Sequence, residues 1–424
     1  MKRITTVLST IAFTVLWLAL LTGQGDAAFV QEPEQAVVQY PNNSCLYRGV
    51  VVGKFVWTGY ETDNQVICDF GSLGVWVWDS GTWTQISGAD PDRIIGAPGF
   101  LYSGMALVGD FGSMGLWKWE SDGILPGAWD QISGQNPSYM FIVNDNGDGS
   151  NDLHAAFPGY GLWRMDGNSG QWTALSTSLP LIGLAADFWA PGWQEGVHSF
   201  GPLGVWYFGV GASPVSGQLS AATAWDDHAA ADFGVGGGSV SLIMDFGPLG
   251  TWLAEDVSAF PVAWHQLSSF EPLRVKEVVF AESGNLDCEL LCAFKSAAMP
   301  GLWYWDYTSF PGTWTNLRSL TPGPGFCEPF NVDGASIGGD ADDEVAVDFD
   351  GMGLMVYNFQ DGSWVRLSSM NPVFMVRFDL AGIGVANCLV VDFGAGVGLW
   401  CYDGAAKSWF QLTSQSPDEL FDTD

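Results

Sequence analysis

Basic residues are scarce in this 424-residue chain. It contains 14 Lys and Arg against 47 Asp and Glu, which gives a formal net charge of -33. Phosphate backbones and anionic membrane surfaces repel so acidic a chain, and this excludes nucleic acid as a natural partner. Calcium, cationic ligands and neutral glycans remain compatible with the charge. The alternative is that the acidity only keeps an aromatic-rich protein soluble.

Histidine is also rare, and this leaves little support for catalysis. The four histidines are His154, His198, His228 and His265, and none of them lies in a nucleophile or metal-binding motif. His154 and His198 occupy nearly the same place in adjacent sequence units, which suggests packing or a surface role. Paired carboxylates stay possible, because 47 acids offer many combinations and a sequence contains no distances.

Only one long apolar run occurs, and it is at the N-terminus. It has the parts of a secretory signal: a basic start at Lys2 and Arg3, an apolar run over 11–21, and small residues at Gly25 and Ala27. We therefore predict a signal peptide over 1–27, a linker over 28–46 and export to the periplasm or the extracellular space. An uncleaved anchor is the alternative, but the run is short for a spanning helix. After cleavage we expect no membrane insertion.

Seven cysteines are present, and they do not form a recognisable disulfide framework. The number is odd and the spacing fits neither a set of bridges nor a zinc site. Cys388 and Cys401 flank a predicted hairpin and could lie opposite each other. For most of the seven we expect buried free thiols, although an exported protein is permitted disulfides.

Glycine and aromatic residues are abundant, and they recur in one repeated unit. The chain has 55 Gly, 22 Trp and 27 Phe. The clearest copy reads Asp-Phe-Gly-Ser-Leu-Gly-Val-Trp over 69–76, with a second tryptophan at Trp83. The unit occurs eight times, and each copy contains one phenylalanine of the set at 70, 111, 157, 200, 246, 294, 349 and 393. The spacings of 41 to 55 residues fit the blades of a β-propeller, for which roughly 40 to 50 residues are usual.

One unit accounts for four strands. In the second unit, short apolar segments at 94–97, 105–111, 116–119 and 129–132 are separated by glycine-containing turns. We therefore predict an all-β fold over 47–424, a single β-propeller of eight four-stranded antiparallel blades. Seven blades, with an incomplete or split terminal unit, is the alternative. We expect a monomer.

Two sets of tryptophans repeat with the unit. We expect the third-strand set to fill the seams between blades, because a wide seam needs large flat apolar groups: Trp76, Trp117, Trp163, Trp206, Trp252, Trp303 and Trp400. The outer-strand set lies nearer the blade edges, and we take it as the better candidate for exposed contacts: Trp83, Trp129, Trp172, Trp264, Trp314, Trp364 and Trp409.

The segment over 144–152 has the pattern of a calcium loop. Its oxygen-bearing side chains fall at relative positions 1, 3, 5 and 9, a backbone carbonyl can add a ligand, and a glycine permits the sharp turn. An EF-hand would need Glu at position 12, where this chain has Ala155. The alternative is an ordinary Asn/Asp/Gly turn. The predicted calcium ligands are Asn144, Asn146, Asp148, Ser150 and Asp152.

An acidic loop that runs into an apolar strand, then Phe-Gly and a glycine-rich turn, resembles the FG-GAP and VCBS repeats of integrin-like propellers. The resemblance covers about 47–424. It implies a propeller, often of seven blades, with several calcium sites. This chain has the full loop only before Phe157. A partial loop with Asp340, Asp342 and Glu344 precedes Phe349 and is a weaker second candidate.

The sequence therefore predicts a secreted binding or adhesion propeller that recognises a protein or glycan. Two other functions remain open. One is an extracellular hydrolase or lyase that acts on glycans through carboxylates in the central channel. The other is a purely structural secreted repeat protein.

Overall fold

The computed structural model describes residues 50–53, 65–79, 81–98, 100, 105–121, 125–145, 150–186, 195–209, 215–224, 228–231, 241–254, 262–279, 288–294, 296–306, 312–329, 344–358, 362–380, 385–404 and 406–417. The predicted signal peptide, 1–27, and linker, 28–46, lie outside the described residues. In the described ranges, no helix combines the length and the apolar character needed to cross a bilayer.

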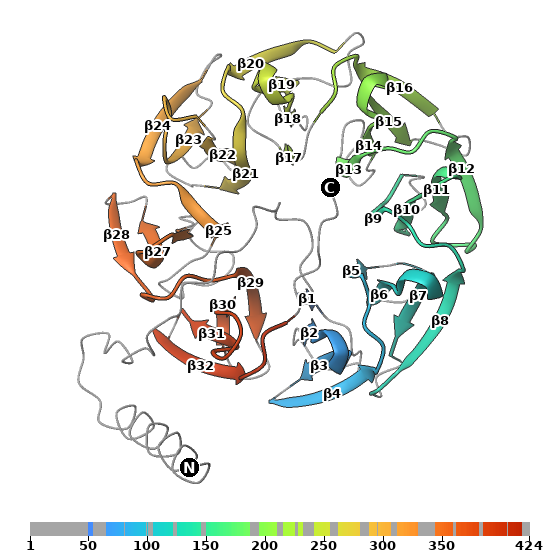
Figure 1. Ribbon diagram of the computed structural model, residues 1–424, viewed down its shortest axis with the longest axis horizontal. Coiled ribbons are helices and arrows are strands. Elements are labelled where there is room, and N and C mark those ends of the chain that lie inside the picture. The colour runs from blue at the N-terminus through green and yellow to red at the C-terminus, as the bar shows by residue number, and fades with distance from the viewer. Residues whose placement is uncertain are drawn as a thin grey trace, which may run out of the picture.

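Eight four-stranded antiparallel sheets form a ring around a central axis (Figure 1). Every sheet is built from four strands that follow one another in the chain, with the first strand nearest the axis and the fourth at the rim. The prediction of an eight-bladed propeller is confirmed. The terminal blades are neither incomplete nor split, so the seven-bladed alternative is wrong.

The first four blades run from β1 to β16. Blade 1 contains β1 (Val50–Gly53), β2 (Gln65–Asp69), β3 (Val75–Asp79) and β4 (Thr82–Ser87). Blade 2 contains β5 (Arg93–Pro98), β6 (Met105–Asp110), β7 (Leu116–Glu120) and β8 (Ala128–Ser133). Blade 3 contains β9 (Tyr139–Val143), β10 (Asp152–Phe157), β11 (Gly161–Met165) and β12 (Trp172–Ser176). Blade 4 contains β13 (Ile182–Ala186), β14 (Glu195–Ser199), β15 (Val205–Gly209) and β16 (Val215–Ser220).

The other four blades run from β17 to β32. Blade 5 contains β17 (His228–Ala231), β18 (Ser241–Asp245), β19 (Thr251–Ala254) and β20 (Trp264–Ser268). Blade 6 contains β21 (Pro272–Val279), β22 (Cys288–Phe294), β23 (Leu302–Asp306) and β24 (Thr313–Arg318). Blade 7 contains β25 (Pro322–Pro329), β26 (Val345–Phe349), β27 (Gly353–Asn358) and β28 (Ser363–Arg366). Blade 8 contains β29 (Phe374–Leu380), β30 (Val385–Asp392), β31 (Leu399–Asp403) and β32 (Ser408–Thr413).

The described side chains in the second strand of each blade are buried on both faces, because a neighbouring blade covers the strand on each side. In β2, Val66 and Cys68 pack into a cluster with blade 8, whereas Ile67 packs into a cluster with blade 2. This follows from the alternation of side chains along a strand. The strands of the second blade, β5 to β8, match the sequence prediction to within two residues at each end.

The Asp-Phe-Gly segment forms the turn between the second and third strands. In blade 1, the side chain of Asp69 accepts a hydrogen bond of 3.0 Å from the Gly71 amide, and the turn continues as η1 (Gly71–Leu73). Gly74 follows with φ of 76°, where a Cβ would lie 2.2 Å from the Ser87 carbonyl oxygen. Only glycine fits such a position. Equivalent turns are η3 (Gly112–Met114), η4 (Gly201–Leu203) and η5 (Gly247–Leu249).

The outer-strand tryptophans connect neighbouring blades. The indole Nε1 of Trp129 in blade 2 donates to the Ile86 carbonyl of blade 1 at 2.8 Å, and its ring meets Phe111 edge-on. The same bond to the preceding blade is made by Trp83, Trp172, Trp264, Trp314 and Trp409. The expectation that this set is available for exposed contacts is therefore wrong, because the indoles are half-buried in the seams.

The third-strand tryptophans bind within their own blade. The indole of Trp76 donates to the Leu73 carbonyl at 2.8 Å, and the equivalent bonds recur in blades 2, 3, 4, 5, 6 and 8. Some of these rings, including Trp163 and Trp252, also pack against the clusters between blades. This set therefore contributes to packing as predicted, but its polar contact holds a turn and not a seam.

Among the described residues, side-chain contacts and no shared sheet close the ring between blades 8 and 1. Trp83 donates across this seam to the Leu412 carbonyl at 3.0 Å. Three thiols, Cys68, Cys388 and Cys401, are buried in the apolar cluster beside it and are free. Cys292 is likewise a buried thiol, as expected from the sequence, and its Sγ donates to the Ala293 carbonyl at 3.7 Å. Cys388 and Cys401 are not directly opposite, since Cys388 pairs with Asp403 in the register of β30 and β31.

Candidate functional site

The predicted calcium loop joins β9 to β10 in blade 3. In the register of these strands Val143 pairs with Asp152, so the two ends of the loop lie side by side. Asn144, Ser150 and Asp152 are described, whereas Asn146 and Asp148 lie outside the described residues. The structure thus brings the first and last predicted ligands to the same end of the blade.

The second candidate loop is described only at its end. Asp340 and Asp342 lie outside the described residues. Glu344 is buried, one residue before β26 begins. Its Oε1 accepts a hydrogen bond of 3.4 Å from the Asn358 side-chain amide.

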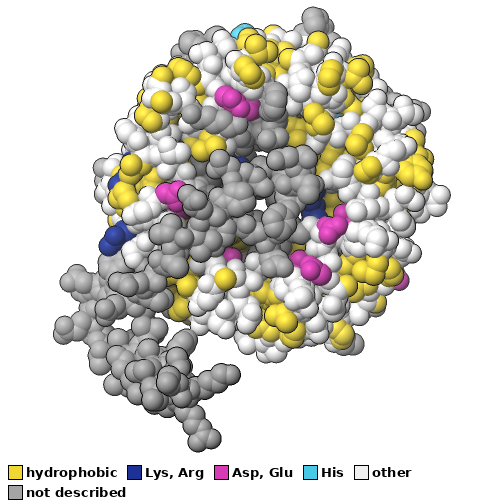
Figure 2. Space-filling model, in the orientation of Figure 1, with side chains coloured by type: hydrophobic (Ala, Val, Ile, Leu, Met, Phe, Trp, Pro, Cys, Tyr) yellow, Lys and Arg dark blue, Asp and Glu magenta, His cyan; other side chains and the backbone are white. Residues whose placement is uncertain are grey.

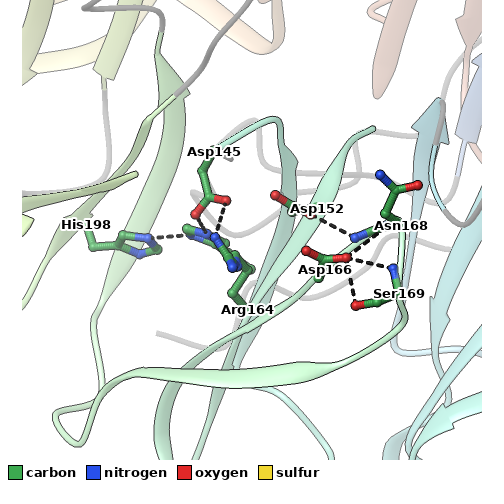
Figure 3. A network of polar contacts seen from close by, with 9 residues as sticks. Asp145, Asp152, Arg164, Asp166, Asn168, Ser169 and His198 are labelled. Atoms are coloured by element: carbon green, nitrogen blue, oxygen red, sulfur yellow. Dashed lines mark hydrogen bonds and ion pairs between the residues drawn. The ribbon is translucent and has the colours of Figure 1, made fainter. Parts of the chain in front are cut away.

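Asp145, next to the predicted ligand Asn144, is the centre of a buried polar network (Figure 3). Its Oδ1 accepts from Arg164 Nη1 at 3.0 Å and its Oδ2 lies 2.8 Å from His154 Nε2. Burial by itself would raise the pKa of Asp145, but the facing His154 and Arg164 and a hydrogen bond from Asp152 outweigh it. The pKa is lowered to about 2, so Asp145 is an anion at neutral pH.

Asp152 is the protonated partner in this network. Its Oδ1 accepts from the Gly167 amide at 2.7 Å. Burial, followed by the hydrogen bond to the Asp145 carboxylate and the charge of Asp145, raises the pKa of Asp152 to about 9. The adjoining turn is held by Asp166, which accepts from the backbone of Asn168 and from the backbone and hydroxyl of Ser169 (Figure 3).

A pair of imidazoles extends the network into blade 4. His154 Nδ1 of β10 lies 3.0 Å from His198 Nε2 of β14, and His198 Nδ1 contacts the Tyr139 hydroxyl. Burial and the neighbouring His154 lower the pKa of His198 well below its usual value. His198 is therefore neutral. The contacts form a continuous line from Tyr139 on β9, through both imidazoles, to Asp145 and Arg164.

Two glycines make room for the imidazole pair. A Cβ at Gly196 would lie 2.5 Å from the His154 ring. A Cβ at Gly183 would lie 2.7 Å from the Phe141 ring and 2.9 Å from His198 Nδ1. Any larger side chain at Gly196 would push the two blades apart, so these glycines determine how closely blade 4 approaches blade 3.

This network joins blades 3 and 4 through hydrogen bonds. His154 and His198 are both 0% exposed, and every imidazole nitrogen faces a hydrogen-bonding partner. The packing role expected for these histidines is confirmed and the surface role is wrong. The sequence showed that the two histidines lie near the same strand position in adjacent repeats, but it did not single out Asp145, Arg164 or Tyr139. Among the described residues, no group of three or more His, Cys, Asp or Glu is arranged to hold a metal ion.

Comparisons with known proteins identify no family. No protein-family profile matches the sequence, and no curated protein matches it. Among solved structures, Sqt1 of Saccharomyces cerevisiae is 9% identical with a TM-score of 0.49, covering 81% of this chain and 93% of that chain. Apo AztD from Citrobacter koseri is 13% identical with a TM-score of 0.48, covering 81% and 92%. BBS1N in complex with ARL6DN is 11% identical with a TM-score of 0.43, covering 82% and 89%.

Likeness at this level supports no statement about activity or partners. The fold assignment rests on the eight sheets of this chain, and the resemblance to FG-GAP and VCBS repeats stays a prediction. The chain is an eight-bladed β-propeller, and no family is shown for it.

Proposed function

We propose that this protein is a secreted, non-catalytic binding propeller that recognises a protein or a glycan and has a calcium-stabilised loop over 144–152. The observation that carries the proposal is the anchoring of that loop at both ends. Asp145 is tied to Arg164 and His154, and Asp152 to the Gly167 amide. A loop fixed at its base loses less conformational entropy when it binds, and this favours recognition.

Calcium fits the donors of the loop. The ion prefers six to eight oxygen ligands, and the loop supplies oxygens from Asn144, Asn146, Asp148, Asp152 and the Ser150 carbonyl. Asp152 would have to ionise and share its carboxylate with the Gly167 amide. Asp145 would keep its ion pair with Arg164, and its negative charge would favour a cation in the loop without Asp145 being a ligand.

The calcium proposal has a direct test. We expect calcium to raise the melting temperature of the wild type, because an ion that binds only the folded state stabilises it by mass action. Asp148→Ala should abolish this rise. Asp130→Ala is the matched control, since it removes an exposed acid from the outer strand β8 of the neighbouring blade, away from the loop. An unchanged melting temperature for the wild type in calcium would refute the proposal.

Catalysis is the less favoured alternative. Acids in the central channel could serve a hydrolase or lyase, but the described network of Asp145, His154 and His198 is buried between blades 3 and 4. A purely structural role is the other alternative. A glycan array, with hydrolysis of each bound glycan monitored, tests the glycan readings: binding without turnover supports the proposal, and turnover supports the enzyme. The structural role is supported only if neither a glycan nor a protein segment binds.

A further inference from the structure

Five consecutive blades each present one exposed apolar side chain at the same turn. These residues lie between the second and third strands of blades 1 to 5, and each is about half-exposed. We name them the apolar arc: Leu73 (50% exposed), Met114 (47%), Tyr160 (57%), Leu203 (55%) and Leu249 (55%). In blade 6 the equivalent residue is Pro300, which is exposed, whereas Met352 and Val397 at the same place in blades 7 and 8 are half-buried. The exposed apolar residues of these turns therefore cover one side of the ring, and the blade repeat alone does not explain their distribution.

The turns that carry the arc are rigid. The Leu203 carbonyl accepts hydrogen bonds from Trp206 Nε1 at 2.8 Å and from Gln218 Nε2 at 3.0 Å. The same two bonds reach the carbonyls of Leu73, Met114 and Leu249. These side chains consequently stand on fixed turns and would lose little backbone freedom in a complex.

All five arc residues share one face of the propeller with further apolar groups. In a four-stranded antiparallel blade, the turn between strands two and three and the connection to the next blade leave from the same end. The connection from blade 3 to blade 4 contains Leu179 and Leu181, which are 41% and 61% exposed. A Cβ at Gly201 would lie 3.3 Å from the Leu181 side chain, so Leu181 continues the surface around Leu203.

Charged residues on this face are mostly acidic. Asp90 and Asp92 in the connection to blade 2, and Asp350 in the blade 7 turn, are exposed, whereas Arg93 and Arg318 are half-buried. Figure 2, which draws one face of the ring, shows hydrophobic groups over successive blades and acidic side chains nearer the centre. The chain as a whole carries a net charge of -33, which attracts cations and repels a second copy of itself.

We propose that the apolar arc is a docking surface for a protein segment that combines apolar side chains with basic ones. The partner lies across several adjacent blades and places apolar groups on the arc, while its basic groups face the acidic field. This inference rests on the proposed binding function and names the class of partner. Exposed apolar surface rimmed by polar residues marks interaction sites, and here one exposed apolar side chain recurs on each of five adjacent blades.

The test uses synthetic peptides with the full chain. A peptide of alternating Leu and Lys is the probe, with Leu–Glu and Ser–Lys peptides of equal length as comparisons, measured by fluorescence anisotropy at physiological salt. The variant is Leu203→Ser with Leu249→Ser. Val365→Ser is the matched control, because Val365 is 53% exposed but lies on the outer strand β28. We expect the double variant to bind the Leu–Lys peptide at least about tenfold more weakly and the control to match the wild type.

Several results would overturn the proposal. Equal binding of the Leu–Lys peptide by the double variant and the wild type would do so, as would equal binding of the Leu–Glu or the Ser–Lys peptide. Self-association of the wild type that the double variant loses would assign the arc to a second copy. If the double variant does not fold, Leu73→Ser with Met114→Ser tests the other end of the arc. A glycan from the array that binds the double variant unchanged, without Leu–Lys binding to the wild type, would refute the arc and leave the binding function intact.

Discussion

Replacing Trp83 with Phe should weaken the interface between blades 8 and 1, which closes the ring. Phe keeps an aromatic ring against Phe70, which Trp83 meets at 5.4 Å, but it removes the indole donor to the Leu412 carbonyl. A lost hydrogen bond of this kind costs about 1 kcal/mol, which corresponds to roughly a fivefold increase in the population of the opened seam. Since no strand in the described part of the chain is shared between blades 8 and 1, this opening should occur without global unfolding.

Buried thiols report the opening. Cys68, Cys388 and Cys401 lie in the closing seam and are 0% exposed. Burial, together with the charges of Asp392 and Asp69, raises the pKa of the Cys68 thiol well above its usual value, so a thiol reagent reacts only after the seam opens. Mass spectrometry of labelled peptides should show Trp83→Phe accelerating their modification about fivefold relative to the wild type.

A matched control and a reference separate this local effect from general destabilisation. Trp129→Phe removes the equivalent bond to the Ile86 carbonyl in a seam that the continuous chain also joins, and it should leave the labelling of Cys68 unchanged. Cys292 in blade 6 is buried and serves as the internal reference. If Trp129→Phe accelerates the labelling of Cys68 as much as Trp83→Phe does, the closing seam has no special weakness and the reasoning is refuted.

Two further predictions concern the interior. Gly196→Ala places a Cβ 2.5 Å from the His154 ring and should lower the free energy of unfolding by about 1 to 3 kcal/mol in urea titrations. Gly134→Ala, where a Cβ meets nothing within 4 Å, should change it by less than about 0.5 kcal/mol, and equal effects would contradict the crowding argument. Burial and then the neighbouring Asp92 raise the pKa of Asp110 from 3.8 to about 7, against the lowering effects of the Gly112 amide and Arg93. Because folding raises this pKa, the protonated form is favoured, and the contribution to stability is full below pH 4 and is lost as the pH rises toward 7. The loss of folding stability between pH 4 and pH 7 is at most roughly 4 kcal/mol, and about half that after solvent screening. Asp110→Asn keeps an acceptor for the Gly112 amide and should remove most of this pH dependence. An unchanged slope of stability against pH in the variant would rule out Asp110 as the cause.

The repeat made the architecture predictable from the sequence. Strand periods, glycine turns and the spacing of the phenylalanines all describe local structure, and each blade is a local unit of four consecutive strands. This is why the strands of blade 2 were predicted to within two residues. The predicted calcium loop is a local feature of the same kind, since the hairpin of β9 and β10 places its two ends side by side.

The roles of the two tryptophan sets were not predictable in the same way. Both sets repeat with the blade, and both are half-buried, so neither periodicity nor composition tells them apart. The difference is the direction in which the indole Nε1 points: from Trp76 to its own turn, and from Trp129 to the preceding blade. That direction depends on how adjacent blades are placed, which no local pattern records.

By itself the sequence determined the class of fold, the number of units, the turn chemistry and the acidic character of the surface. These follow from local backbone preferences and from composition. The tertiary structure alone decided how the ring closes, that His154 and His198 pair across a seam beside Asp145, and that five turns expose one apolar side chain each on a common face. Such features depend on contacts between residues distant in the chain, and packing against neighbouring blades determines them.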